Sequence, residues 1–215
     1  FGMAERRPIA TREAGWARAL AARLAAMGLS ANAISVLGAV FALVAGAAFV
    51  LSDGPDWRAW LVVAAAGIQL RLLCNMFDGM VAVEHGRATP VGALYNDVPD
   101  RIADTVILVG AGYAVAAGPW NPTLGWACAV MAMFTAFVRV LGGALGTPQY
   151  FFGPQSKSQR MAVLTVAALV GAILPRPEWA GRLVTLALVI VLAGSTLTVV
   201  RRVRRIAGEL RARGP

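Results

Sequence analysis

The residues best suited to chemistry in this chain are carboxylates, and they gather in one short segment. Asp and Glu together number only 11 in 215 residues. Five of them lie between positions 75 and 104: Asp78, Glu84, Asp97, Asp100 and Asp104. Unpaired charges beside apolar sequence are costly, so their clustering calls for a partner such as a cation. Oxygen ligands without a supporting set of Cys and His favour Mg²⁺, Mn²⁺ or Ca²⁺ over zinc.

Helical spacing predicts that these oxygens converge. Asn75 and Asp78 are three residues apart, while Asn96, Asp100 and Asp104 follow one another at intervals of four. Residues spaced in this way share one face of a helix. Two adjacent helices can therefore direct both groups at a single point, and the sequence predicts a cation held between them.

The elements that must position this site are apolar helices. Hydrophobic residues make up 58% of the chain and charged residues 14%, whereas an ordinary soluble domain is about one quarter charged. One crossing of a bilayer takes roughly 20 apolar residues, and no segment has the strict alternation of a barrel strand. Six apolar runs, separated by segments with glycine or proline, are the expected spans: 31–51, 57–77, 102–116, 124–145, 161–174 and 183–200. We expect the third and fifth to extend into their polar flanks.

The basic residues predict the orientation of these spans. The net charge is +9, and most Lys and Arg residues lie outside the apolar runs. Basic segments tend to stay in the cytoplasm, and the two richest in Lys and Arg are 1–30 and 201–213. We therefore expect an integral protein of the cytoplasmic membrane, with both termini and the carboxylate cluster on the cytoplasmic side.

Two segments flank the predicted spans. Within 10–27, four apolar residues recur at intervals of three or four and predict an amphipathic helix on the membrane surface: Trp16, Leu20, Leu24 and Met27. The basic run 201–205 is interpreted as a topology anchor attracted to anionic lipid. Nucleic-acid binding by so short a run is the weaker explanation, and no nucleic acid is expected as a partner.

The stretch from position 75 to 100 resembles the signature of the CDP-alcohol phosphotransferase family, D-x-x-D-G-x-x-A-R-x8-G-x-x-x-D-x-x-x-D. Five signature positions match in register without a gap: Asp78, Gly79, Ala82, Gly92 and Asp100. Three positions depart from it. The first and third aspartates are replaced by Asn75 and Asn96, and the arginine by Val83. An Asn carbonyl oxygen can still ligate a hard cation, but two negative charges are absent.

The resemblance implies a fold, an activity and a site. The fold is an all-α membrane protein with six transmembrane helices and an N-terminal amphipathic surface helix. The activity is transfer of a phosphoalcohol group, phosphatidyl above all, from a CDP-alcohol such as CDP-diacylglycerol to a hydroxylated acceptor, releasing CMP, in phospholipid synthesis. Mg²⁺ or Mn²⁺, as one ion or two, would be held by Asn75, Asp78, Asn96 and Asp100. CDP would contact Asp78, Gly79, Ala82 and Gly92, and Asp100 would be the catalytic general base.

The remaining expectations concern partners and domains. Three basic residues are expected either to bind a phosphate or other anion on the acceptor or to be positive-inside anchors: Arg139, Lys157 and Arg160. The expected partners are the CDP-alcohol lipid donor, the acceptor, membrane lipids and a second copy of the chain in a homodimer. We divide the chain into an N-terminal cytoplasmic segment with the amphipathic juxtamembrane helix (1–30), a six-helix transmembrane catalytic domain (31–200) and a basic cytoplasmic tail (201–215).

Two alternatives remain open at this point. The asparagines and Val83 are compatible with a catalytically impaired family member that binds a CDP-alcohol or lipid. Carboxylates inside a membrane also line the ion paths of transporters. An ion-coupled transporter is the less favoured hypothesis, because the runs show no evident internal repeat and the charges crowd one end of the spans instead of the midplane.

Overall fold

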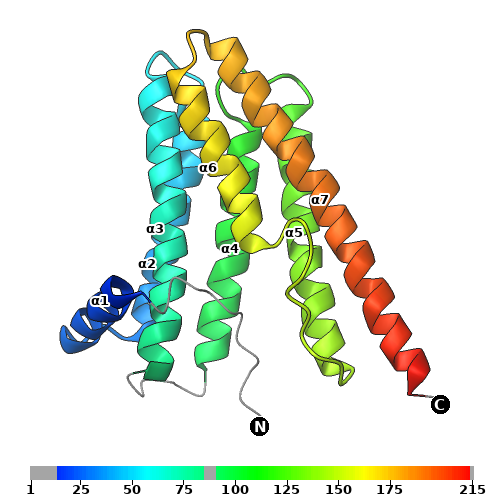
Figure 1. Ribbon diagram of the computed structural model, residues 1–215. Coiled ribbons are helices and arrows are strands. Elements are labelled where there is room, and N and C mark those ends of the chain that lie inside the picture. The colour runs from blue at the N-terminus through cyan, green and yellow to red at the C-terminus, as the bar shows by residue number, and fades with distance from the viewer. Residues whose placement is uncertain (1–13, 85–90, 214–215) are drawn as a thin grey trace.

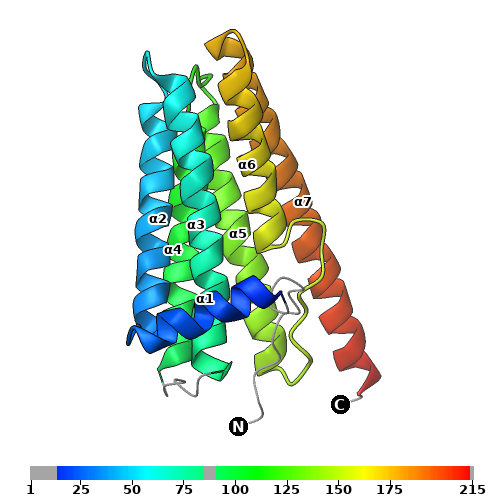
Figure 2. The same ribbon diagram turned by 60° about the vertical axis from the view of Figure 1, so that its left-hand side comes forward.

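The described part of the chain is entirely helical. The computed structural model describes residues 14–84 and 91–213. Its helices are α1 (Gly15–Ala26), α2 (Ala31–Leu51), α3 (Trp57–Glu84), α4 (Gly92–Gly112), α5 (Asn121–Ala144), α6 (Lys157–Ile173) and α7 (Pro177–Ala212). Figure 1 shows α2 to α7 as a bundle of roughly aligned helices, and Figure 2 shows α1 lying across its lower end. The expected all-α class is confirmed.

Four of these helices are long and apolar enough to cross a membrane: α2, residues 57–82 of α3, α5 and α7. Helix α2 has the bounds of the first predicted run, and the hydroxyl of Ser30 caps it by accepting a hydrogen bond from the Ala33 N–H at 3.1 Å. Helices α3 and α4 extend beyond their apolar runs into the carboxylate segment. Helix α7 continues without a break through position 200, so the described part of the predicted tail is helical.

Glycines fix the position of α4 in the bundle. A Cβ added at Gly110 of α4 would lie 2.7 Å from the Gly46 Cα of α2, and one added at Gly112 would lie 2.8 Å from the Asn121 carbonyl oxygen of α5. Such distances are shorter than real Cβ contacts, so only glycine allows these backbones to approach. Helix α4 is thus held between α2 and α5, which sets its register against α3 as well.

Helix α6 begins inside the bundle. Figure 1 shows the connection from α5 returning along the bundle before α6 starts at about half its height. Gln155 and Ser156, the last residues of this connection, are buried, and the Gln155 N–H donates to the Thr198 hydroxyl of α7 at 3.2 Å. Non-helical backbone at this depth is tolerated where protein covers it. The consequence is that the first turn of α6 delivers its basic residues to the interior.

Helix α1 packs on the bundle through small residues. Ala17, Ala21 and Ala25 are buried, and the ring of Trp16 meets that of Phe77 on α3 edge-on, with centroids 6.4 Å apart. Leu20 of α1 and Met27, the residue that follows the helix, are also exposed. The first residues of the predicted helix 10–27 lie outside the described part of the chain.

Candidate active site

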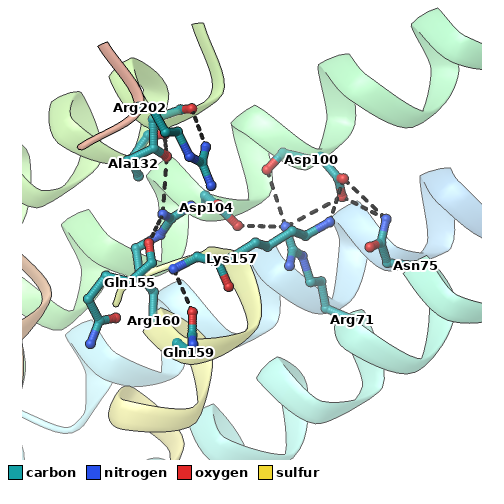
Figure 3. Close-up of polar contacts among 12 residues, drawn as sticks. Arg71, Asn75, Asp100, Asp104, Ala132, Gln155, Lys157, Gln159, Arg160 and Arg202 are labelled. Carbon is teal, nitrogen blue, oxygen red and sulfur yellow. Dashed lines mark hydrogen bonds and ion pairs between the residues drawn. The ribbon is translucent and has the colours of Figure 1, made fainter. Parts of the chain in front are cut away.

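Asn75 and Asp100 meet across the interface between α3 and α4. The Asn75 amide nitrogen donates to both carboxylate oxygens of Asp100, each at 3.1 Å. Figure 3 shows the two side chains pointing toward one another from their separate helices. Asn75 lies nine residues before Glu84, the end of α3, or about 13 Å along the helix axis at 1.5 Å per residue. The contact is therefore well inside the bundle.

Asp78 lies on the same face of α3, where α2 also contributes. Its Oδ2 accepts a hydrogen bond from the Ser35 hydroxyl at 2.7 Å. Its Oδ1 is buried and has no hydrogen-bond donor among the described residues. A pocket between α2, α3 and α4 is lined by Ser35, Asn75, Asp78 and Asp100, with Arg71 at one side. Three of the four predicted cation ligands thus line one pocket.

A second set of charges lies one helical turn further into the bundle. Asp104 accepts from the Arg71 guanidinium at 2.6 Å through Oδ1 and from the Arg160 guanidinium at 2.8 Å through Oδ2. Arg71 also contacts Asp100, at 3.2 Å from its backbone carbonyl oxygen and 3.4 Å from Oδ1. The Lys157 ammonium forms an ion pair with Asp100 Oδ2. The interior thus holds a connected network of carboxylates and cations (Figure 3).

Arg71 is a site residue that we did not single out from the sequence. It lies within the predicted apolar run 57–77, towards the end of that run and four residues before Asn75, and its side chain is 1% exposed. A charge inside an apolar run needs a partner within the protein. Its spacing of four from Asn75 is the signal that could have placed it on the same helix face as the motif.

Two of the three predicted anion-binding residues join this network and one does not. Lys157 and Arg160 contact Asp100 and Asp104, respectively. Arg139 instead faces Asp97 at 3.5 Å, and its guanidinium lies over the Phe151 ring. Whether any of the three binds an acceptor stays a prediction.

Arg202 departs from the interpretation of run 201–205 as a surface anchor. It is 4% exposed and donates to the carbonyl oxygens of Phe152 at 2.9 Å and Thr135 at 2.7 Å. The Thr135 hydroxyl in turn accepts from Arg160 at 3.2 Å, so two arginines converge on Thr135. The buried face of α7 includes Thr198, Arg202 and Ile206 at intervals of four. Extending the helical period past position 200 would have predicted the inward direction of Arg202.

The rest of the signature is described less fully. Gly79 and Ala82 lie on α3 in the turn after Asp78. Gly92 and Asn96 belong to α4, but their side-chain surroundings, and those of Val83, lie outside the described residues. Among the side chains that are described, no group of three or more His, Cys, Asp and Glu residues is arranged to hold a metal ion.

Comparisons with known proteins agree with the motif. No family model matches the chain. A phosphatidylinositol phosphate synthase of Streptomyces avermitilis is 26% identical over 196 residues, covering 88% of this chain and 77% of that protein. The enzyme of the same name from Cutibacterium acnes is 28% identical over 203 residues, covering 88% and 92%. These relatives are CDP-alcohol phosphatidyltransferases, the family whose signature the segment 75–100 resembles.

Solved structures support the fold of the chain. The phosphatidylinositol phosphate synthase of Mycobacterium tuberculosis in complex with manganese and citrate has a TM-score of 0.74 at 21% identity, over 88% of each chain. The same enzyme with CDP-DAG bound has a TM-score of 0.71 at 22% identity, over 90% of this chain and 94% of that one. At this identity the likeness extends to the fold, and the site must be argued from this chain's own residues.

Proposed function

We propose that the protein transfers a phosphatidyl or related phosphoalcohol group from a CDP-alcohol, such as CDP-diacylglycerol, to a hydroxylated acceptor and releases CMP in phospholipid synthesis. The observation that carries this proposal is the pocket in which Asn75, Asp78 and Asp100 meet in the register of the family signature. The names of the relatives add support, as does the related enzyme solved with CDP-DAG.

The residues of the pocket fit one divalent cation, Mg²⁺ or Mn²⁺. Asp78 Oδ1 is a buried carboxylate oxygen without a hydrogen-bond donor among the described residues, which is the environment that a cation would satisfy. The other expected ligands are Asp100, Asn75 and Asn96. Asn75 would use its amide oxygen, which requires rotation of the amide group from the orientation that donates to Asp100. The related enzyme solved with manganese supports this choice. When bound, the cation offsets negative charge on the diphosphate and on the departing CMP.

The chain's own residues bind the donor and move one proton. Gly79 and Ala82 follow Asp78 on α3, and their small size lets the cytidylyl group approach the helix, as is also expected of Gly92. Asp100 is the general base. It accepts the proton of the acceptor hydroxyl as that oxygen bonds to the donor phosphorus and the bond from phosphorus to the CMP oxygen breaks. Direct attack of this kind needs no covalent enzyme intermediate.

The acceptor is expected on the α6 side of Asp100. Lys157 already contacts Asp100, and Arg160 lies one turn further along α6 beside Asp104. A phosphate or other anion on the acceptor would be attracted to these cations, and Arg139 is the third candidate for this role. Basic side chains bind phosphate through charge-assisted hydrogen bonds.

The membrane arrangement is part of the proposal. Helices α4 and α6 would add two crossings to the four apolar ones, giving six within the domain 31–200. The lower end in Figure 1, which carries α1 and the basic end of α7, would face the cytoplasm with the site. Helix α1 would rest on the membrane surface through Trp16, Leu20 and Met27, which are exposed. The proposed partners also include a second copy of the chain in a homodimer.

The test is CMP release by the purified protein from CDP-diacylglycerol with Mg²⁺ or Mn²⁺. Glycerol 3-phosphate, inositol, inositol phosphate and serine are offered as separate acceptors, and Asp100→Asn is the control. Release with one acceptor, lost in the variant, is the expected result and names the acceptor. A folded protein that releases no CMP with any of them would contradict the proposal.

A catalytically impaired binding protein is the second candidate, and one contact favours it. Both oxygens of Asp100 accept hydrogen bonds from Asn75, where the family signature has an aspartate. The variant Asn75→Asp with Asn96→Asp would then create activity that the unmodified protein lacks. Efficient CMP release by the unmodified chain rules this candidate out.

A further inference from the structure

The charges of the site balance without any added ion. Among the described side chains, two carboxylates line the pocket, Asp78 and Asp100, and a third, Asp104, pairs with the pocket residue Arg71. The positive groups are Arg71, Lys157 and Arg160, which pair with Asp100 and Asp104. Three negative and three positive charges sum to zero. Charges in such a place are tolerated because they are paired, so this neutrality is a condition of the fold.

The neighbouring charges do not add negative charge to this count. Asp97 is the next carboxylate on α4, and it has two basic partners of its own, Arg101 at 3.3 Å and Arg139 at 3.5 Å. The replacement of two signature aspartates by Asn75 and Asn96 removes two negative charges, which equals the charge of one divalent cation. The chain has therefore lost ligand charge equivalent to one metal ion.

Arg71 supplies positive charge where a further cation would otherwise have to bind. Its guanidinium lies between the two α4 carboxylates, 2.6 Å from Asp104 and 3.4 Å from Asp100. Lys157 covers the other oxygen of Asp100. The single cation would take the place of the Asn75 amide nitrogen at Asp100. A second metal ion there would have to displace Lys157 as well and leave that buried ammonium without its ion-pair partner, which is strongly destabilising. The carboxylate oxygen without a donor is on Asp78, on the α2 side of the pocket.

We propose that this site binds a single divalent cation and that the cation binds together with the diphosphate of the CDP-alcohol. The guanidinium of Arg71 supplies the positive charge that a second cation would otherwise supply. This inference rests on the proposed function and deepens it. One divalent cation would bring the neutral cluster to a charge of +2. The diphosphate of a CDP-alcohol carries two negative charges and restores neutrality. Cation and donor should therefore strengthen each other's binding, and by the same factor.

The experiment measures Mn²⁺ binding instead of turnover. The purified full chain is titrated with Mn²⁺ and followed by electron paramagnetic resonance, with and without CDP-diacylglycerol and with no acceptor. We expect one Mn²⁺ per chain in the presence of CDP-diacylglycerol, and an affinity lower by about tenfold or more in its absence, a usual size for coupling between two ligands. Two Mn²⁺ ions per chain, or one affinity in both conditions, would overturn the inference.

Two variants separate the charge argument from other causes. Asn75→Asp with Asn96→Asp restores two negative charges with almost no change in side-chain size, and should raise Mn²⁺ affinity without donor by about tenfold or more, since ligand charge sets affinity. Arg71→Met should act in the same direction if the protein folds. The matched control is Arg101→Met, because Arg101 pairs with Asp97 outside the pocket, and its Mn²⁺ binding should be unchanged. Asparagine-to-aspartate variants with unaltered affinity would contradict the charge argument.

The outcome is independent of the test of the proposed function. CMP release together with two bound Mn²⁺ ions would leave the transferase in place and refute the single-cation site. A chain that binds one Mn²⁺ only with CDP-diacylglycerol and releases no CMP would support the site and refute the transfer activity.

Discussion

Arg71 of α3 and Asp104 of α4 form a 2.6 Å ion pair, with the two residues 1% and 6% exposed. Neither charge can reach water if the other is removed. Breaking a buried pair by removing one partner typically costs about 3–5 kcal/mol, because a charge is left buried and unpaired. We therefore expect Asp104→Asn to lower the free energy of unfolding by roughly this amount, measured by denaturant titration in detergent.

The surface ion pair of Asp97 and Arg101 is the control for this prediction. Asp97 is about half exposed, with a side-chain exposure of 46%, and exposed pairs contribute only about 0–1 kcal/mol. Asp97→Asn should thus leave stability nearly unchanged. Equal losses in the Asp97 and Asp104 variants would show that the buried network has no special part in stability.

Gly110 tests the packing that fixes the register of α4. A Cβ at this position would lie 2.7 Å from the Gly46 Cα, too close for the two backbones to keep their contact. Overpacking of this kind typically costs about 1–3 kcal/mol, so Gly110→Ala should lower the melting temperature. Gly208 is also helical and has nothing within 4 Å, so Gly208→Ala should leave it unchanged or slightly higher. A Gly110 variant as stable as the Gly208 variant would contradict the assigned helix contact.

The sequence predicts the apolar framework better than the ends of its helices. Helix α2 has the predicted bounds because its composition is apolar throughout. The third run was predicted to start at position 102 with an extension into its polar flank, and α4 begins at Gly92. Asp100 and Asp104 lie on this helix and face the interior network instead of solvent. Hydropathy alone does not register such residues as part of a buried helix.

Some contacts of the site follow from residue spacing along a helix, and others depend on how the helices are placed relative to one another. The meeting of Asn75, Asp78 and Asp100 could be predicted because it depends on spacing within two adjacent helices. The pairing of Arg71 with Asp104 depends on how far α4 slides along α3, which the glycine contacts set. The depth of Lys157 depends on the irregular path of the α5–α6 connection, which has no sequence period to reveal it.

Substitution of Asp78 should weaken cation binding more directly than substitution of any other described residue of the pocket. Asp78→Asn replaces a carboxylate oxygen that has no donor among the described residues, and removes a formal charge from the proposed ligand set. Metal stabilisation of a transferring phosphoryl group is worth several kcal/mol, and each 1.4 kcal/mol is about tenfold in rate. We expect kcat/KM for CMP release to fall by about 100-fold or more.

Ser35→Ala is the matched control for Asp78. It removes the 2.7 Å hydrogen bond to Asp78 Oδ2 and a 3.2 Å contact with the Ala31 carbonyl oxygen of the same helix. A hydrogen bond to a charged group contributes about 1.5–3 kcal/mol. Its effect on kcat/KM should be smaller than that of Asp78→Asn and should be partly recovered at higher Mn²⁺ concentration. A Ser35 variant that loses as much activity as the Asp78 variant at saturating Mn²⁺ would argue against Asp78 as the cation ligand.

Arg202 tests whether the end of α7 is part of the interior. Its guanidinium donates to the carbonyl oxygens of Phe152 and Thr135, which holds the buried α5–α6 connection against α5. Arg202→Met keeps an unbranched apolar stem but removes these hydrogen bonds, and each bond from a charged donor is worth about 1.5–3 kcal/mol. We expect a loss of stability of about 3 kcal/mol, measured by denaturant titration, and a weaker hold on Arg160 through Thr135. Arg201 is exposed on the same helix, and Arg201→Met should change stability by no more than about 0.5 kcal/mol. If the two variants behave alike, Arg202 is a surface anchor like its neighbours and the α5–α6 connection is held by other contacts, such as the hydrogen bond from Gln155 to Thr198.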